Sequence, residues 1–245
     1  MERSCGHRIR TQPLTFSETL LSDAQQLMAR ESVHFLSGCA VPKEHPITGD
    51  SHDFLLSVSA EMDQMPSHDD RKIVDGMSPD IQSDEVLTMR NYLARLVATL
   101  ERFQRPNEKN LAHPWVEHFL PISAVPEYFE VVKKEFPKDV LLLWPIRTAK
   151  LRQPMLCLPA VDEVVLVGIL CSRRLSDLAE VLPRLRKVDE LGVALGGKRY
   201  LSGWLDFDID RWSQHYGVER WKEVISLQRK YDPVRLFRLW ERTTE

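Results

Sequence analysis

The sequence has little that would indicate a metal site, a nucleic-acid-binding surface or a membrane span. Its four cysteines form no Cys-x-x-Cys pair, so the ligand spacing of a zinc site is absent and we predict no metal. The 33 Lys and Arg residues do not exceed the 36 Asp and Glu residues, so no basic excess neutralises phosphates and we exclude nucleic acid. Apolar runs such as residues 164–171 are far shorter than the ~20 residues of a spanning helix, so we expect no membrane association.

Glycine is also scarce, and this limits cofactor binding. Only ten glycines occur, and no cluster of them follows a predicted strand, so a glycine-rich loop around a dinucleotide pyrophosphate is missing. No Gly-x-Ser-x-Gly occurs to support hydrolase chemistry. The first ten residues are polar and lack the apolar stretch of a signal peptide. Wide cysteine spacing is typical of reduced thiols, so we expect a cytoplasmic protein with a small-molecule or protein partner.

The hydrophobic periodicity predicts helices interleaved with strands. Apolar residues at three- and four-residue steps predict helices at residues 15–30, 83–103, 124–136, 175–187, 208–216 and 220–230, with a last turn at 233–240. Short apolar runs predict strands at residues 33–41, 53–61, 115–121, 140–145, 161–171 and 192–201. We expect Pro183 to kink or end its helix. Strict βαβ alternation is absent, so we predict an α+β fold whose mostly antiparallel sheet is covered by helices on one face.

A series of short motifs then follows in a fixed order along residues 24–236. The most informative are HPWVEHFLP at 113–121, VLLLWPIRTAK at 140–150, GKRYL at 197–201, WSQHYG at 212–217 and YDP at 231–233. Each is weak alone, but the ordered set resembles the cytokinin dehydrogenases, which are FAD-linked oxidases of the vanillyl-alcohol-oxidase type. The resemblance implies the fold of the substrate domain of such oxidases.

This resemblance also implies a domain arrangement and a function. Residues 1–195 are expected to form the substrate-binding domain, and residues 196–245 the C-terminal segment that returns to the FAD domain in relatives. The implied function is the substrate-binding portion of an FAD-dependent oxidoreductase that oxidises a C–H next to an amine or alcohol. Most of the FAD site is missing here, so a separate flavin-domain chain is the expected partner. The alternative is a non-catalytic small-molecule-binding or protein-interaction module derived from that family.

The resemblance assigns candidate residues to the flavin and to the substrate. The K-x-Y-L motif implies flavin contacts from Lys198, Tyr200 and Leu201. The substrate-binding candidates are Ser37, His113, Trp115 and Trp144. The aromatic and His candidates are equally compatible with core packing. Ser37 replaces an acidic residue of relatives and cannot act as a base near neutral pH, so no catalytic residue is assigned.

Two further expectations concern surfaces. The face that relatives bury against a flavin domain would be open, which predicts a homodimer or poor solubility. His215 and Tyr216 are expected to stabilise the C-terminal helix pair rather than to perform chemistry.

Overall fold

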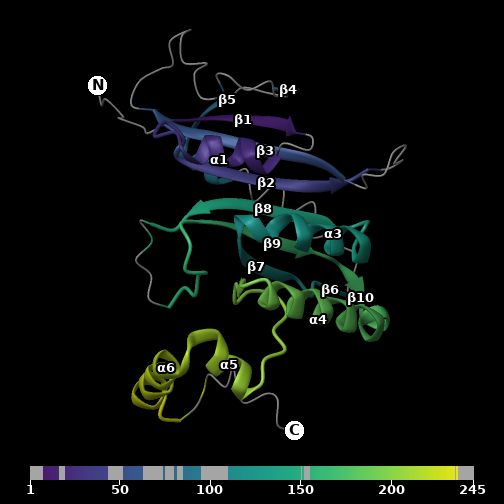
Figure 1. Ribbon diagram of the computed structural model, residues 1–245, viewed down its shortest axis with the longest axis vertical. Helices are drawn as coiled ribbons and strands as arrows, with labels where there is room; N and C mark the ends of the chain where they lie inside the picture. Colours follow the sequence, from purple (N-terminus) through teal and green to yellow (C-terminus); the bar gives the residue numbers. More distant parts are fainter. Residues whose placement is uncertain are drawn as a thin grey trace.

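The computed structural model describes residues 8–16, 20–43, 52–62, 74, 80–81, 85–94, 110–149, 151, 155–234 and 236. Within them, nine strands form one sheet in the order β11-β7-β9-β8-β2-β3-β1-β4, with β5 also paired to β1 (Figure 1). All of its pairings are antiparallel. The strands of this sheet are β1 (Arg8–Phe16), β2 (Phe35–Pro42), β3 (His52–Met62), β4 (Asp80–Ile81), β5 (Glu85–Thr88), β7 (Val116–Pro121), β8 (Val140–Arg147), β9 (Glu163–Leu170) and β11 (Lys198–Arg199).

The remaining elements are mostly helices. A small second sheet pairs β6 (Leu111–Ala112) with β10 (Arg173–Arg174). The helical elements are α1 (Leu20–Met28), η2 (Ile122–Ala124), α3 (Val125–Glu135), η3 (Leu175–Asp177), α4 (Leu178–Ala194), α5 (Ile209–Tyr216) and α6 (Val218–Tyr231). Among the helices described, none combines the length and apolar character that a bilayer crossing requires. The predicted α+β fold with a mostly antiparallel sheet is confirmed.

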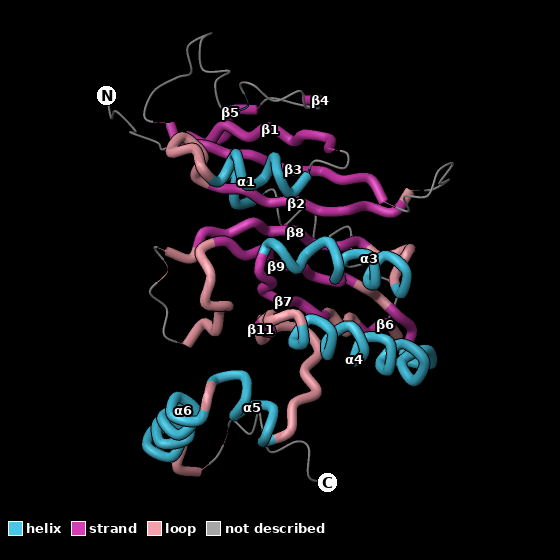
Figure 2. The backbone as a smooth tube through the Cα atoms, viewed as in Figure 1, coloured by secondary structure: helices cyan, strands magenta, loops and turns pink. Residues whose placement is uncertain are grey.

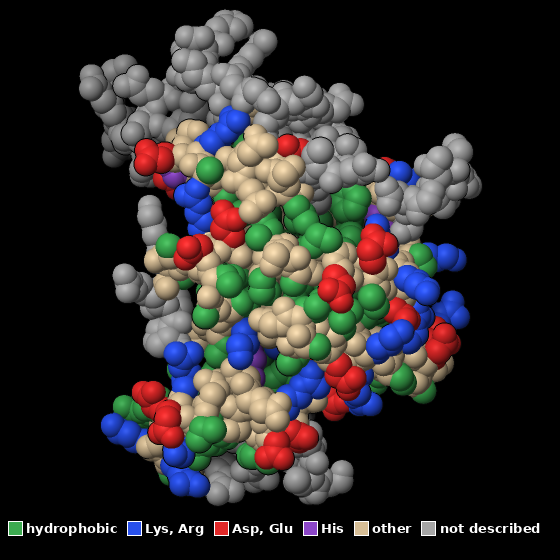
Figure 3. Space-filling model, viewed as in Figure 1, with side chains coloured by type: hydrophobic (Ala, Val, Ile, Leu, Met, Phe, Trp, Pro, Cys, Tyr) green, Lys and Arg blue, Asp and Glu red, His purple; other side chains and the backbone are tan. Residues whose placement is uncertain are grey.

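Helices α1, α3 and α4 cover one face of the large sheet, and the main core lies between these layers (Figure 1). Every second residue of a strand contributes to it, as Leu141 and Leu143 do on β8 and Val165 and Val167 do on β9. Over the outside of α3 and α4, acidic and basic side chains are intermixed (Figure 3), and Glu135 pairs there with two cations of α4.

Pro183 does not end its helix, because α4 continues past the predicted end at residue 187 to Ala194. Proline in a helix interior costs about 3 kcal/mol. Val181, Leu185 and Val188 are fully buried on the sheet side of α4, and each such burial stabilises by about 2 kcal/mol. Burial along one face of the helix therefore outweighs the cost of the proline.

The predicted strand at residues 192–201 is also wrong over most of its length. Residues 192–194 belong to α4, and only Lys198 and Arg199 form a strand, β11. Within the helix, a Cβ at position 192 would lie 2.8 Å from the His118 ring, so this position has space for a glycine but not for a side chain. The glycine marks a close helix–sheet approach rather than a strand.

The N-terminal part of the sheet differs from the prediction at two places. Residues 8–16 form β1, where we expected a polar terminus followed by a helix from residue 15, and β1 is held by pairing with β3, β4 and β5. Residues 85–88 form β5 rather than the start of a helix, and the helical residues begin at 89, where Thr88 Oγ1 accepts the Asn91 N–H (3.2 Å) as an N-cap does. The rest of the predicted helix, 95–103, and the last turn at 237–240 lie outside the described residues.

The C-terminal helices form a separate small cluster. A loop over residues 200–208 leads from β11 to α5, and α5 and α6 lie beyond α4, away from most of the sheet (Figure 2). Asp208 caps α5 by accepting the Arg211 N–H at 2.7 Å. The rings of Trp212, Tyr216 and Trp221 stack there within 6.2 Å of one another.

Candidate functional site

The face of the sheet opposite α1, α3 and α4, here called the second face, carries several of the predicted site residues. Leu141 and Leu143 of β8 pack under the helices, so Trp144 points to the second face. On β2, Leu36 and Ala40 contact the same core, which places Ser37 on the second face. Strand alternation thus brings these two substrate-binding candidates to one surface.

The strand register places three of the candidates in one row across the second face. Trp144 pairs with Leu166, Leu166 with Phe119, and Phe119 with Lys198. The β2–β8 register, continued by one residue, sets Ser37 opposite Trp144. Neighbouring strands lie about 4.8 Å apart, so Ser37 and Lys198 are roughly 19 Å apart. One small substrate therefore does not contact both ends of this row.

The other candidates surround β7 and its neighbours. The ring of Tyr200 contacts the ring of Phe119, with centroids 5.5 Å apart. His113 lies before β7, where its Nδ1 is 2.8 Å from Ser172 Oγ and its ring contacts Trp115. Leu201 packs instead against the aromatic cluster of Phe207, Trp212 and Trp221. The assigned roles of all seven residues stay predictions.

The most conspicuous polar group of the second face is Glu117, a residue that the sequence did not single out. Its neighbours Val116 and His118 face the helices, so its own side chain lies on the second face, where it is 6% exposed. A Cβ on Gly168 would stand 3.1 Å from Glu117 Cγ, so the missing side chain at 168 makes room for the carboxylate. Burial raises the pKa of Glu117, and the positive charge of Arg199 partly offsets this effect.

A short loop after β11 fixes the Glu117 carboxylate. The Tyr200 N–H donates to the Glu117 carbonyl and the Trp204 N–H donates to the Trp115 carbonyl, each at 2.9 Å. Between these two contacts the chain bulges, and Ser202 Oγ donates to Glu117 Oε2. Residues 200–204 are called the β11 loop below.

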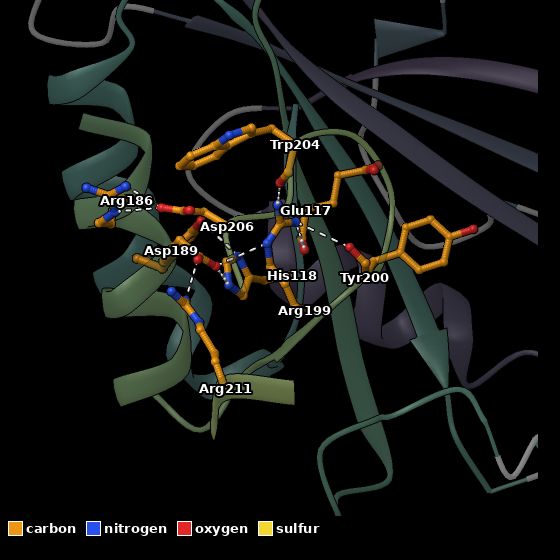
Figure 4. A network of polar contacts seen from close by, with 10 residues as sticks. Glu117, His118, Arg186, Asp189, Arg199, Tyr200, Trp204, Asp206 and Arg211 are labelled. Atoms are coloured by element: carbon orange, nitrogen blue, oxygen red, sulfur yellow. Dashed lines mark hydrogen bonds and ion pairs between the residues drawn. The ribbon is translucent and has the colours of Figure 1, made fainter. Parts of the chain in front are cut away.

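An ion network lies on the helix side of β7 and β11, behind Glu117 (Figure 4). Asp189 of α4 is its centre: its Oδ1 is 2.9 Å from His118 Nε2 and 3.1 Å from Arg199 Nε, and its Oδ2 accepts from Arg211 of α5. His118 is fully buried, and burial lowers its pKa, so the imidazole is neutral. Burial alone would raise the pKa of Asp189, but His118, Arg199 and Arg211 lower it on balance, so Asp189 is ionised.

The described residues fit part of an FAD molecule. Trp144 and Tyr200, 38% and 40% exposed, offer aromatic surface that a flat ring can contact. The three described glycines with positive φ, Gly196, Gly203 and Gly217, are not clustered in the sequence, so they do not form the glycine-rich loop whose N–H groups bind a pyrophosphate. These residues thus suit a ring system but not the phosphates.

Among the residues that the structure describes, no group of three His, Cys, Asp or Glu side chains is placed to hold a metal ion.

Comparison with known proteins identifies the relatives of the chain. A family model described as "Cytokinin dehydrogenase 1, FAD and cytokinin binding" matches residues 76–239. Cytokinin dehydrogenase 1 of Oryza sativa subsp. japonica is 26% identical over 163 residues, a match covering 61% of this chain and 30% of the rice protein.

Solved structures show the same fold at low identity. Berberine bridge enzyme from Eschscholzia californica aligns with a TM-score of 0.55 and 15% identity, over 93% of this chain and 53% of that one. A VAO-type flavoprotein from Myceliophthora thermophila aligns with a TM-score of 0.53 and 14% identity, over 93% and 45%. The chain thus spans 30% to 53% of the length of these relatives. Since the family model covers more than half of the sequence, the chain belongs to the cytokinin dehydrogenase family, of which it represents the FAD- and cytokinin-binding region.

Proposed function

We propose that this chain is the substrate-binding portion of an FAD-dependent oxidoreductase, and that Glu117 is the group that receives the substrate. The observation that carries the proposal is a nearly buried carboxylate on an apolar, aromatic sheet face, fixed by Ser202 through one oxygen. Sites of this kind bind small molecules through apolar contacts and orient them through a few placed polar groups.

The chemistry of oxidation suits a carboxylate at this position. When a C–H next to an amine or alcohol is oxidised, a hydride leaves carbon and a proton leaves the neighbouring N–H or O–H. Ser202 engages Oε2, so Oε1 is the oxygen that accepts this N–H or O–H and then its proton. Burial raises the pKa of Glu117 from its ordinary value toward neutral pH, and this favours transfer of the proton to its carboxylate.

The rest of the enzyme is proposed to come from elsewhere. FAD supplies the hydride acceptor when bound, and a separate flavin-domain chain would hold its phosphates, since the described residues do not. We also propose a cytoplasmic location, because Cys39, Cys157 and Cys171 are free thiols.

A chimera tests the proposed function. Residues 76–239 of this chain replace the matched segment of rice cytokinin dehydrogenase 1, and FAD absorbance, cytokinin binding and cytokinin-dependent dye reduction are measured. We expect a coloured protein that reduces the dye, and a Glu117→Gln variant that stays coloured but loses about 10²-fold in rate.

Two outcomes would contradict the proposal. A coloured chimera that binds cytokinin but does not reduce the dye would favour a non-catalytic binding module. Equal rates with and without the Glu117 carboxylate would remove Glu117 from the reaction.

A further inference from the structure

We propose that Arg199 is a positioning residue that fixes the β11 loop and thereby holds Ser202 against Glu117. The inference rests on the proposed function of Glu117 but concerns a different part of the molecule. Arg199 lies beside His118 and Asp189 on the helix side of the sheet (Figure 4). Glu117 and Ser202 meet on the second face.

The guanidinium of Arg199 binds the two ends of the loop at once. Nη1 donates to the carbonyls of Glu117 (2.8 Å) and Tyr200 (3.3 Å), and Nη2 donates to the carbonyl of Trp204 (2.5 Å). Only the planar fork of an arginine reaches three such acceptors from one rigid group. The Tyr200 and Trp204 N–H groups bond the two ends of the bulge to β7, and the Arg199 side chain links these same two ends to each other.

Arg199 itself is fixed from behind. Its side chain is 1% exposed, and its Nε lies 3.1 Å from Asp189 Oδ1 on α4. Asp189 is held in turn by His118 and by Arg211 of α5. A buried guanidinium is costly without a compensating carboxylate, so Asp189 fixes the position of the Arg199 guanidinium.

The bulge approaches β7 closely at Gly203. Gly203 has φ +64°, and a Cβ there would lie 2.5 Å from the Trp115 carbonyl oxygen. The chain therefore passes tightly over β7 at 203, directly after Ser202. Loss of the Arg199 contacts releases this turn, and Ser202 then no longer donates to Glu117.

The test reads out the Glu117 carboxylate in the lone chain. The protein is labelled with ¹³C at the glutamate carboxyls, the Glu117 signal is assigned by its loss in Glu117→Gln, and its pKa is measured by NMR titration. Arg199→Lys keeps the positive charge but not the fork, and Ser202→Ala removes only the donor. The groups around Glu117 that carry charge or donors are Arg199 and Lys198 of β11 and Tyr200 and Ser202 of its loop.

We expect Arg199→Lys and Ser202→Ala each to raise the pKa of Glu117 by about one unit, because a hydrogen bond to the ionised form is lost. The double variant should show no further rise, since both changes remove the same contact. Arg186→Gln, which breaks the exposed pair between Arg186 of α4 and Asp206 of the loop before α5, is the matched control and should leave the Glu117 pKa unchanged.

Several results would overturn the inference. These are an unchanged Glu117 pKa in either single variant, additive shifts in the double variant, or an equal shift in the Arg186 control. If Arg199→Lys does not fold, Gly203→Ala disturbs the loop from its other side, and an unchanged Glu117 pKa there would reject the role of the loop. The titration uses no cofactor, so it is independent of the chimera's activity. An inactive chimera together with the expected Glu117 pKa shifts would reject only the proposed function. An active chimera together with an unchanged Glu117 pKa would reject only the role of Arg199.

Discussion

At the scale of single residues, Gly192 shows how closely α4 approaches the sheet. A Cβ at this position would lie 2.8–2.9 Å from three atoms of the His118 ring, which is itself fully buried. Replacing this glycine with alanine would gain about 1 kcal/mol of helix propensity. A forced shift in a packed core costs about 1–3 kcal/mol, so the cost of the clash equals or exceeds the gain in propensity.

We therefore predict that Gly192→Ala lowers the free energy of unfolding by about 1 kcal/mol, measured by urea denaturation. Glu190→Ala, on the exposed side of the same helix, is the control and should change stability by less than about 0.5 kcal/mol. A stabilised Gly192→Ala protein would mean that His118 moves aside at little cost.

The residues of the candidate site were only partly accessible to sequence reasoning. The family resemblance singled out Trp144 and Ser37, and the strand register places both on one face. Glu117 was missed because its significance depends on Gly168, its pairing partner on the neighbouring strand β9, and on the Ser202 contact. Arg199 was missed because a basic residue in a short polar stretch gives no sign that it is buried.

At the scale of elements, α4 gives a test of the balance between a helix breaker and burial. Pro183 is exposed, in the second turn of α4, and removes one backbone hydrogen bond. We predict that Pro183→Ala raises the free energy of unfolding by about 1–2 kcal/mol. The gain in helix propensity is larger than the stability lost when the unfolded chain, without the proline ring, gains conformational entropy.

Thermal and urea denaturation would check this change. Arg186→Ala, one turn further along, serves as a control for substitution on the exposed side. A destabilised Pro183→Ala protein would show that the helix needs a bend at this point.

The elements that could be predicted are those whose local pattern agrees with their tertiary environment. β7, β8, β9 and α3 carry strong apolar periodicity, and α3 has Pro126 in its first turn, so their observed ends lie close to the expected ones. β1 could not be predicted, because it contains Pro13 and many polar residues and is defined by its partners β3 and β5.

The pair α5–α6 carries a pH dependence that can be measured. His215 packs against Phe207 and Tyr216, and burial, aided by the charges of Lys198 and Arg199, lowers its pKa to about 4. Between pH 6.5 and 4 the unfolded chain therefore binds a proton that the folded chain does not, and stability falls as pH falls.

We predict that the urea midpoint decreases from pH 7 to pH 5, and that His215→Gln reduces this slope. The slope should not vanish, because burial also lowers the pKa of His118 and acts in the same direction. Equal slopes for the two proteins would mean that His215 is not buried from solvent in the folded state.

At the scale of the whole molecule, the two faces of the large sheet are covered unequally by the described residues. The helix layer protects one face of the sheet, but Trp144 and Tyr200 remain more than a third exposed on the other. Exposed aromatic surface of this kind marks an interaction site.

We predict that the isolated chain self-associates through the second face, and that Trp144→Asp shifts it toward monomer in light scattering. Val193→Asp, at an apolar position on α4 that is more exposed than Trp144, is the control and should not change the mass. A monodisperse monomer for the parent chain would contradict the prediction. If a flavin-domain chain binds the same surface, its addition should dissociate the dimer. It should also protect the fluorescence of Trp144 from quenching by iodide. A partner that binds elsewhere would leave the dimer intact.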